Sequence, residues 1–318
     1  MKDKLINSQN IEGKIYQFDL QEKVSGPTSK NPGQPYIAGT IDVATTSAQD
    51  NIVQVHYTWV TPAFKNGNAN PNYSVLKQII NSGKTVVTDG YDAATIVRLS
   101  PSYALNEFFP EGQDKPVSQA RNEGGFISII PESMLHPEND VARSRFEYDI
   151  VINNAVEIVP EEGDSYVSIS GIVFNFKKEA LPITLTARNK DAGKYFLDLG
   201  ATNDKPVFTT VWGKIVNVLT KTEKVQESAF GSPKVDTITR RTKEYVITGA
   251  NPTPYEFDTE ATITTAELQK VLQDREVYLA ELKKSAEEWR ANRNASSNAV
   301  PAAQATQANA VPSGGFKF

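Results

Sequence analysis

Apolar and polar positions alternate along residues 11–60 and predict three β-strands. The segments IEGKIYQFDLQEKV, YIAGTIDVAT and IVQVHYTWV follow a period of two, and the turn-forming stretches SGPTSKNPGQP and SAQDN separate them. Residues 95–100, 125–130 and 145–159 return to strand character. Between these strands we expect one short helix, at residues 73–81, which ends at Gly83.

A second series of short strands follows the polar stretch PEEGDS at residues 160–165. Its members are YVSISGIVFNF, LPITLTAR, KYFLDL, PVFTTVWGKIVNVL and DTITRRTKEYVIT. Strands at such close spacing favour a small barrel or sandwich over an alternating β-α-β sheet.

The pattern becomes helical at Thr264. Thr264 and Glu267 form a capping-box pair, and apolar residues then recur at helical spacing as far as Trp289. We expect one helix of roughly 40 Å at the usual rise per residue. The remaining residues, 294–318, are rich in Ala, Gln, Asn, Ser and Pro and predict a flexible tail with Phe316 and Phe318 at its tip.

Three strands carry a glycine in the same local context, at Gly13, Gly171 and Gly213. A glycine inside a strand marks a bulge, a bend or a close approach of another backbone or a ligand, and small barrels need such bends. Gly171 and Gly213 lie too close in sequence to belong to separate barrels, so we expect two barrels. The expected division is a first barrel domain with inserted helix and loops at 1–159, a second at 160–260, a helix at 261–293 and a tail at 294–318.

Strongly curved strands of the form apolar-x-Gly-Lys-Ile-apolar, as in GKIYQFDLQEKV and VWGKIVNV, are typical of the OB-fold. Together with AGTIDVAT, VQVHYTWV and the C-terminal tail, they resemble single-stranded DNA-binding proteins, in particular divergent phage-encoded ones. The resemblance implies a mainly β protein with tandem OB-fold-like barrels and a C-terminal helix. It also implies a role in DNA replication or recombination, with single-stranded DNA as ligand and a tail that contacts replication proteins.

The composition is consistent with a chain of two domains, and the charged residues are distributed unevenly along it. The chain has 318 residues, no cysteine and a net charge of -5. Residues 170–246 carry 13 Lys and Arg against 8 Asp and Glu, a balance of +5, whereas the preceding 169 residues carry 13 against 21. A basic segment in an acidic protein is where contacts to phosphate groups are expected.

Aromatic side chains beside basic ones are the candidates for stacking on bases, with the basic neighbours on phosphates. The densest basic run, TRRTKE, adds three cations on a predicted strand, although charge runs are usually solvated faces. The candidate nucleic-acid contacts are Lys14, Tyr16, Phe18, Phe174, Phe176, Trp212, Lys214, Arg240, Arg241 and Lys243, with Arg98 and Arg121 as weaker ones.

The alternation of side chains along a strand predicts which way each of the two tryptophans on strands points. Val53, Val55, Tyr57 and Trp59 share the more apolar face of their strand, so Trp59 is expected in the core. Trp212 and Lys214 share a face opposite Val211. Two roles are therefore open for Trp212: it contacts a ligand, or it is half-buried and structural. Tyr16 and Phe18 fall on the same side of their strand as Lys14, which favours contact with a ligand. The alternative is that they are half-buried aromatic residues at the edge of the sheet.

Enzyme signatures are not found in the sequence. NSGKT at 81–85 has Gln78 where a phosphate-binding loop needs its earlier glycine, and His56 and His136 have no metal-ligand spacing. We expect no catalysis, cofactor or metal. The alternatives are a β-rich structural or assembly protein of a virion and an OB-fold adaptor that binds protein. Self-association stays open.

No apolar run is long enough to span a membrane, and MKDKLINSQN lacks the apolar segment of a signal peptide. We therefore expect a soluble protein of the cytoplasm, the host cytoplasm if it is phage-encoded.

Overall fold

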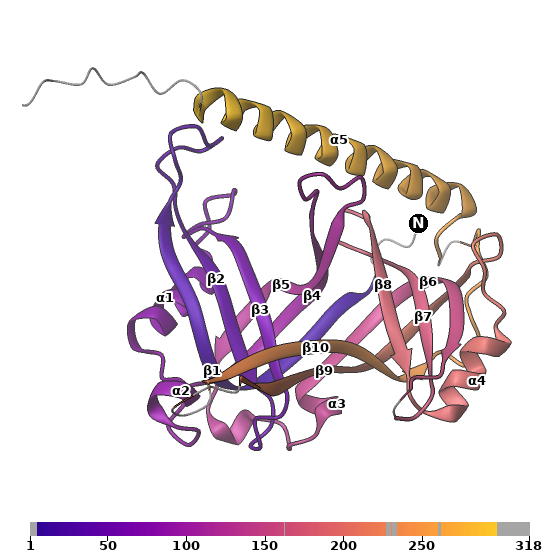
Figure 1. The fold of residues 1–318 in the computed structure, drawn as a ribbon, viewed down its shortest axis with the longest axis horizontal. Coiled ribbons are helices and arrows are strands. Elements are labelled where there is room, and N and C mark those ends of the chain that lie inside the picture. The colour runs from indigo at the N-terminus through magenta and orange to yellow at the C-terminus, as the bar shows by residue number, and fades with distance from the viewer. Residues whose placement is uncertain (1–4, 162, 227–229, 231–233, 260–261, 298–318) are drawn as a thin grey trace, which may run out of the picture.

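The computed structural model describes residues 5–161, 163–226, 230, 234–259 and 262–297 (Figure 1). Its strands are β1 (Asn7–Val24), β2 (Pro35–Ala44), β3 (Ile52–Val60), β4 (Ile96–Phe108), β5 (Val117–Ile129), β6 (Ser144–Ile158), β7 (Tyr166–Phe174), β8 (Ala180–Ala187), β9 (Val207–Gln226) and β10 (Lys234–Ala250). Its helices are α1 (Pro71–Ser82), α2 (Val86–Asp89), η1 (Glu132–Met134), α3 (Asp140–Arg143), α4 (Lys190–Asp198) and α5 (Thr265–Ser297).

The first five strands close into a barrel. β1 pairs with β2, β2 with β3, β5 with β4 and β4 with β1, all antiparallel, whereas β3 and β5 run parallel. The order β2-β3-β5-β4-β1 closes because β1 also pairs with β2. The helices α1 and α2 lie between the third and fourth strands of the chain.

The last five strands repeat that connectivity. β6 pairs with β7, β7 with β8, β10 with β9 and β9 with β6, all antiparallel, and β8 and β10 run parallel. The helix α4 again falls between the third and fourth strands. Five strands in this closed order are the OB-fold. The expected fold class, mainly β with tandem OB-fold-like barrels and a C-terminal helix, is confirmed. The tail was expected at 294–318, but residues 294–297 belong to α5, and residues 298–318 lie outside the described residues.

One ladder joins the two barrels into a single sheet of ten strands. Residues 7–11 of β1 pair antiparallel with residues 144–148 of β6. On its other edge β6 pairs with β9 through residues 145–152, and it pairs with β7 through residues 150–158. This strand, which we expected in the first domain, is therefore part of the second barrel. We therefore propose that the boundary between the domains falls between β5 and β6, within residues 130–143, rather than after residue 159.

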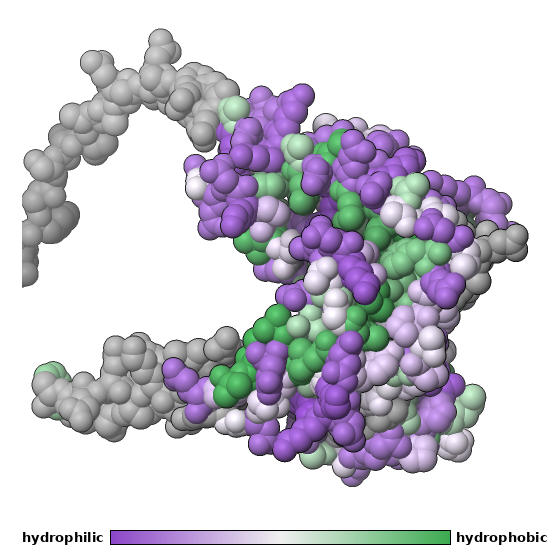
Figure 2. Space-filling model, turned by 90° about the vertical axis from the view of Figure 1, so that its right-hand side faces the viewer, coloured by the Kyte–Doolittle hydropathy of each residue, from purple (hydrophilic) through white to green (hydrophobic). Residues whose placement is uncertain are grey.

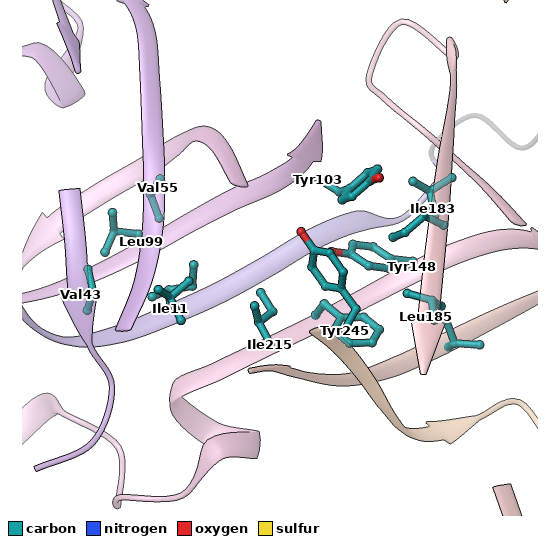
Figure 3. Close-up of a cluster of buried hydrophobic side chains, with 14 of the residues drawn as sticks. Ile11, Val43, Val55, Leu99, Tyr103, Tyr148, Ile183, Leu185, Ile215 and Tyr245 are labelled. Atoms are coloured by element: carbon teal, nitrogen blue, oxygen red, sulfur yellow. The ribbon is translucent and has the colours of Figure 1, made fainter. Parts of the chain in front are cut away.

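Aromatic residues fill the junction between the barrels. Tyr103 of β4, Phe146 and Tyr148 of β6 and Tyr245 of β10 lie with ring centroids 4.7 to 6.2 Å apart. Figure 3 shows three of these tyrosines between the aliphatic core of the first barrel and that of the second. The two barrels therefore share one continuous buried core.

The segment KYFLDL, expected as a strand, forms most of helix α4 instead. The Asn189 side chain accepts hydrogen bonds from the backbone N–H groups of Asp191 and Ala192, which caps the helix, and Phe196 is buried. The alternating segment is so short that its pattern fits a strand and a short helix equally well. The capping asparagine stabilises the helix.

The recurring glycines mark places where two backbones come too close for a side chain. An ideal Cβ on Gly13 would lie 2.1 Å from the carbonyl oxygen of Ala44, and one on Gly213 would lie 2.0 Å from that of Val246. The ladders shift register beside both, between Ile15 and Gln17 and between Ile247 and Gly249. These bulges bend the strands, as expected for barrel corners.

Helix α5 begins as the sequence predicts and bridges the two barrels (Figure 1). The Thr264 hydroxyl accepts a hydrogen bond from the Glu267 N–H, and the Glu267 carboxylate accepts one from the Thr264 N–H at 2.9 Å. Ile263 and Leu268 then bury against Phe208 of the second barrel. Further along, Arg275 pairs with Glu107 of β4 at 2.6 Å and donates to the Ala180 carbonyl of β8.

Replacing Gly213 by alanine should lower the free energy of unfolding by about 2 kcal/mol, because the new methyl group must displace the Val246 carbonyl. The matched control is Gly26→Ala, where no atom lies within 4 Å of the added Cβ. Urea unfolding of the three proteins measures the difference. Equal midpoints for the Gly213→Ala and Gly26→Ala proteins would show that the close approach does not constrain this strand.

Replacing Arg275 by methionine should cost about 3 kcal/mol, because it leaves the Glu107 carboxylate, 3% exposed, buried without its partner. The control is Lys284→Met on the same helix, whose pair with Glu288 is solvated and should change stability by less than about 1 kcal/mol. Chemical unfolding compares the two, and the Arg275→Met/Glu107→Leu double variant should regain part of the loss. A loss no larger than that of Lys284→Met would rule out the bridging role of this pair.

Candidate functional site

A β-bulge turns Trp59 to the outside of the first barrel. Between the pairs Gly39–Tyr57 and Ile37–Val60, β3 has one residue more than β2. Tyr57 is buried and Trp59 is 44% exposed, so the strand changes phase within the bulge. The expectation that Trp59 lies in the core is therefore wrong, because simple parity does not hold across an inserted residue.

Trp59 forms an aromatic pair with Tyr36 of β2. The two rings are stacked, with centroids 3.9 Å apart and planes 22° from parallel. Lys23 of β1 lies opposite Tyr36 in the neighbouring ladder and is exposed. In OB-folds this face, over the second and third strands, is the one that binds oligonucleotides and oligosaccharides.

Basic side chains lie further along β3. His56 points out of the barrel between buried Val55 and Tyr57, and the pKa of His56 lies below 6.5 because of burial and of the charges on Arg121 and Lys243. Arg121, on the parallel neighbour β5, is itself 3.5 Å from Glu123. A strip therefore runs along β3 from the Trp59–Tyr36 stack to three basic groups that come from β3, β5 and β10.

Lys243 belongs to a long hairpin of the second barrel that reaches the first. We call residues 216–226 of β9 and 234–244 of β10 the arm; Figure 1 shows these strands crossing from one barrel to the other. Asn217 of the arm donates to the Ile52 carbonyl at 2.7 Å, and its N–H donates to the Asn51 side chain at 2.8 Å. Two buried amides thus hold the arm at the start of β3.

A cavity of about 910 Å³ lies between the barrels and under α5. Its walls come from β4 and β5 of the first barrel and from β7 and β8 of the second, with Lys243 and Tyr245 of β10 below and Leu272, Arg275 and Leu279 of α5 above. Figure 2 shows the corresponding side of the molecule as two lobes around a deep hollow, with apolar residues gathered on the inner wall. We call this space the interbarrel cavity.

Trp212 and Lys214 lie on the outward side of β9, between buried Val211 and Ile215, as strand parity predicts. The Trp212 indole covers Gly249 of β10, where an added Cβ would lie 2.3 Å from the indole nitrogen, and 40% of the residue stays exposed. Trp212 therefore has both a packed side and an open side, and its role in binding stays a prediction.

Three of the expected contacts are turned into the protein. Lys14 is 4% exposed, because its ammonium lies 4.4 Å from the Tyr91 ring centroid and donates to the Asp92 carbonyl, both in the segment that follows α2. Phe174 is 1% exposed in the cluster under Ile263, so no base can reach it. Phe18 packs on the core of the first barrel, since the bulge beside Tyr16 reverses the phase of β1.

The other candidates divide by exposure. Tyr16 is half-buried at that bulge, and Phe176, in the turn after β7, is 91% exposed with Lys177 beside its ring. The backbones of Arg240 and Arg241 pair with Thr220 and Leu219 in the arm, and their side chains lie outside the described part.

Arg98, a weaker candidate, is a structural residue. Its guanidinium donates to the buried Glu12 carboxylate at 2.7 Å. Burial raises the pKa of Glu12, but hydrogen bonds from Arg98, Asn10 and His136 outweigh that effect and lower it to about 2.

The described residues contain no cluster of three or more His, Asp or Glu side chains placed to hold a metal ion. Among these residues there is also no helix with the length and apolar character needed to cross a bilayer.

Together, the twin barrels and the exposed face of β3 define a tandem OB-fold protein. A family profile matches residues 6–285, and the chain belongs to the YorF family. Two solved structures are similar to it, both of the single-stranded DNA-binding protein from Thermus aquaticus. The wild type shares 10% identity at a TM-score of 0.45, over 80% of this chain and 97% of that one. A deletion mutant shares 10% at 0.46, over 80% and 98%. A search of curated proteins found no match.

The depressed pKa of His56 gives a test of the basic strip. Lys243→Met should raise that pKa toward 6.5, because one of the two positive charges that disfavour the imidazolium is removed. Lys205→Met, at an exposed lysine in the loop before β9, is the control and should leave His56 unchanged. The measurement is an NMR titration of the imidazole protons. An unchanged His56 titration in the Lys243→Met protein would contradict the placement of the arm on β3.

Proposed function

We propose that this protein binds single-stranded DNA with little sequence preference and performs no catalysis. The Trp59–Tyr36 stack is the observation that carries the proposal. It lies over the second and third strands of an OB barrel, where such folds bind oligonucleotides, and it leaves 44% of Trp59 exposed. A base that stacks on an exposed aromatic ring contributes about 1 to 3 kcal/mol whatever its sequence, because every base has a flat face.

Cations beside the stack would neutralise the phosphates. Lys23 lies across the ladder from Tyr36, and the charges of Arg121 on β5 and Lys243 on β10 act on His56 of β3. We also propose Arg240 and Arg241 of β10 as phosphate contacts, with Lys214 beside Trp212. Each phosphate contact releases counterions, and binding should therefore weaken as salt rises.

Trp212 and Phe176 are the second group of proposed stacking residues. Both keep an exposed aromatic surface next to a lysine, Lys214 for the first and Lys177 for the second. The role we propose for the whole protein is to hold single strands unpaired during DNA replication or recombination, with replication proteins as partners of its C-terminal tail.

The test is a fluorescence-anisotropy titration of labelled oligo-dT at low and high salt. Trp59→Ala should weaken binding about tenfold, since it removes one base-stacking platform. The matched control is Trp289→Ala on α5, the most exposed tryptophan at 62%, which should change affinity less than about twofold. Circular dichroism shows whether each variant keeps its fold.

Two outcomes would overturn the proposal. In the first, the wild-type protein shows no binding to oligo-dT even at low salt. In the second, Trp59→Ala and Trp289→Ala weaken binding equally, which would mean that the affinity does not come from the β2–β3 face.

A further inference from the structure

The interbarrel cavity contains a lysine without a partner. Among the described residues no hydrogen bond or ion pair involves the Lys243 ammonium, which lies 5.1 Å from the centroid of the Tyr245 ring. The neighbouring carboxylate, Glu244, points away and is held by Arg188 through contacts of 2.7 Å. A half-buried cation that lines a cavity and is not engaged in an ion pair can attract an anion.

The cavity also offers apolar surface opposite this cation. Leu105 and Ile183 come from the walls and Leu272 and Leu279 from α5. The hydroxyl groups of the two lining tyrosines are already used, since Tyr103 donates to the Pro182 carbonyl and Tyr245 to Asn122. These rings therefore present carbon edges to the cavity. Its charged lining groups are Lys243 on one side and Arg275 and Glu276 of α5 on the other, and Arg275 is already paired with Glu107.

Size and position fit a nucleotide. The volume of about 910 Å³ lies within the usual range for small-molecule sites. The charge of Lys243, which lines the cavity, acts on His56, and His56 lies on the same outer face of β3 as Trp59. A strand that follows β3 from the stack would therefore come close to Lys243.

We propose that the interbarrel cavity is a second binding site, which takes one nucleotide unit with its phosphate on Lys243 and its base against the apolar side chains of α5. Where that unit is part of the bound strand, the proposal rests on the function proposed above. A free nucleotide has the same chemistry, and the experiment separates the two sources.

The proposal has a pH signature. Burial lowers the pKa of Lys243 to about 7, and only the protonated amine attracts a phosphate. Affinity should therefore be constant below about pH 7 and fall by up to about tenfold per pH unit above it. Tyr245, Arg275 and Glu276 line the cavity with this lysine, and Glu244 is its neighbour on β10. His56 on β3 interacts with it and is itself affected by Asp42 on β2 and Arg121 on β5.

These neighbours do not reproduce that signature. The pKa of His56 lies below 6.5, and burial raises that of Tyr245 well above 10.

The experiment measures binding of the dinucleotide TpT and of labelled oligo-dT between about pH 6 and about pH 8.5. TpT is chosen because its phosphodiester does not titrate there, whereas a phosphate monoester would, near pH 6. In the wild type, TpT affinity should fall across this range. Lys243→Arg should flatten the profile because a guanidinium stays charged. Lys243→Met should reduce the affinity at about pH 6 to the wild-type value at about pH 8.5, and Lys205→Met should change nothing.

The two proposals fail in different ways. Oligo-dT binding that needs Trp59 but has the same pH profile in the Lys243→Met protein would overturn the cavity site and leave the proposed function standing. TpT binding with the expected profile, without any oligo-dT binding, would support a site for free nucleotides and remove the proposed function. Equal loss of affinity at every pH in both Lys243 variants would assign the lysine a structural role and overturn the site.

Discussion

The pairing of residues 7–11 with residues 144–148 is the constraint on which the rest of the molecule depends. It makes β1 and β6, the first strands of the two barrels, neighbours in one sheet. The two barrels then bury Phe146, Tyr148 and Tyr245 between them and share one core. A chain with two OB-folds on a flexible linker would present two independent faces, whereas here the orientation of the second barrel is determined by hydrogen bonds along a common edge.

Because the orientation is fixed, hairpins of one barrel extend onto the surface of neighbouring elements outside that barrel. The arm is the hairpin between the fourth and fifth strands of the second barrel, yet Asn217 anchors it to β3 of the first. The hairpin of β4 and β5 likewise reaches α5, where Lys283 pairs with Asp114 at 2.7 Å. The basic strip and the interbarrel cavity both result from this exchange, since each is built from segments of both barrels.

The sequence predicts repeating features well and local exceptions poorly. Alternation and the three glycines lead to two barrels, and the capping pair Thr264 and Glu267 predicts where the last helix begins. Trp59 was expected in the core and is exposed, because it lies within a one-residue bulge of β3. Phe18, for which a half-buried position was the alternative, packs on the core after a bulge of β1. A bulge changes the face that later residues occupy without changing the composition of the strand. The burial of Phe174 depends on Ile263, almost ninety residues away, and no local pattern contains that contact.

The interaction of α5 with β4 has a consequence for how the chain folds. Arg275 and Glu107 are 168 residues apart, so this contact is among the last that a chain made from its N-terminus can form. Until the helix has been synthesised, the apolar walls of the interbarrel cavity face water, although both barrels are already complete. The nascent protein therefore passes through a state in which this apolar surface is exposed and can associate with other chains. Packing of α5 onto the barrels covers the surface.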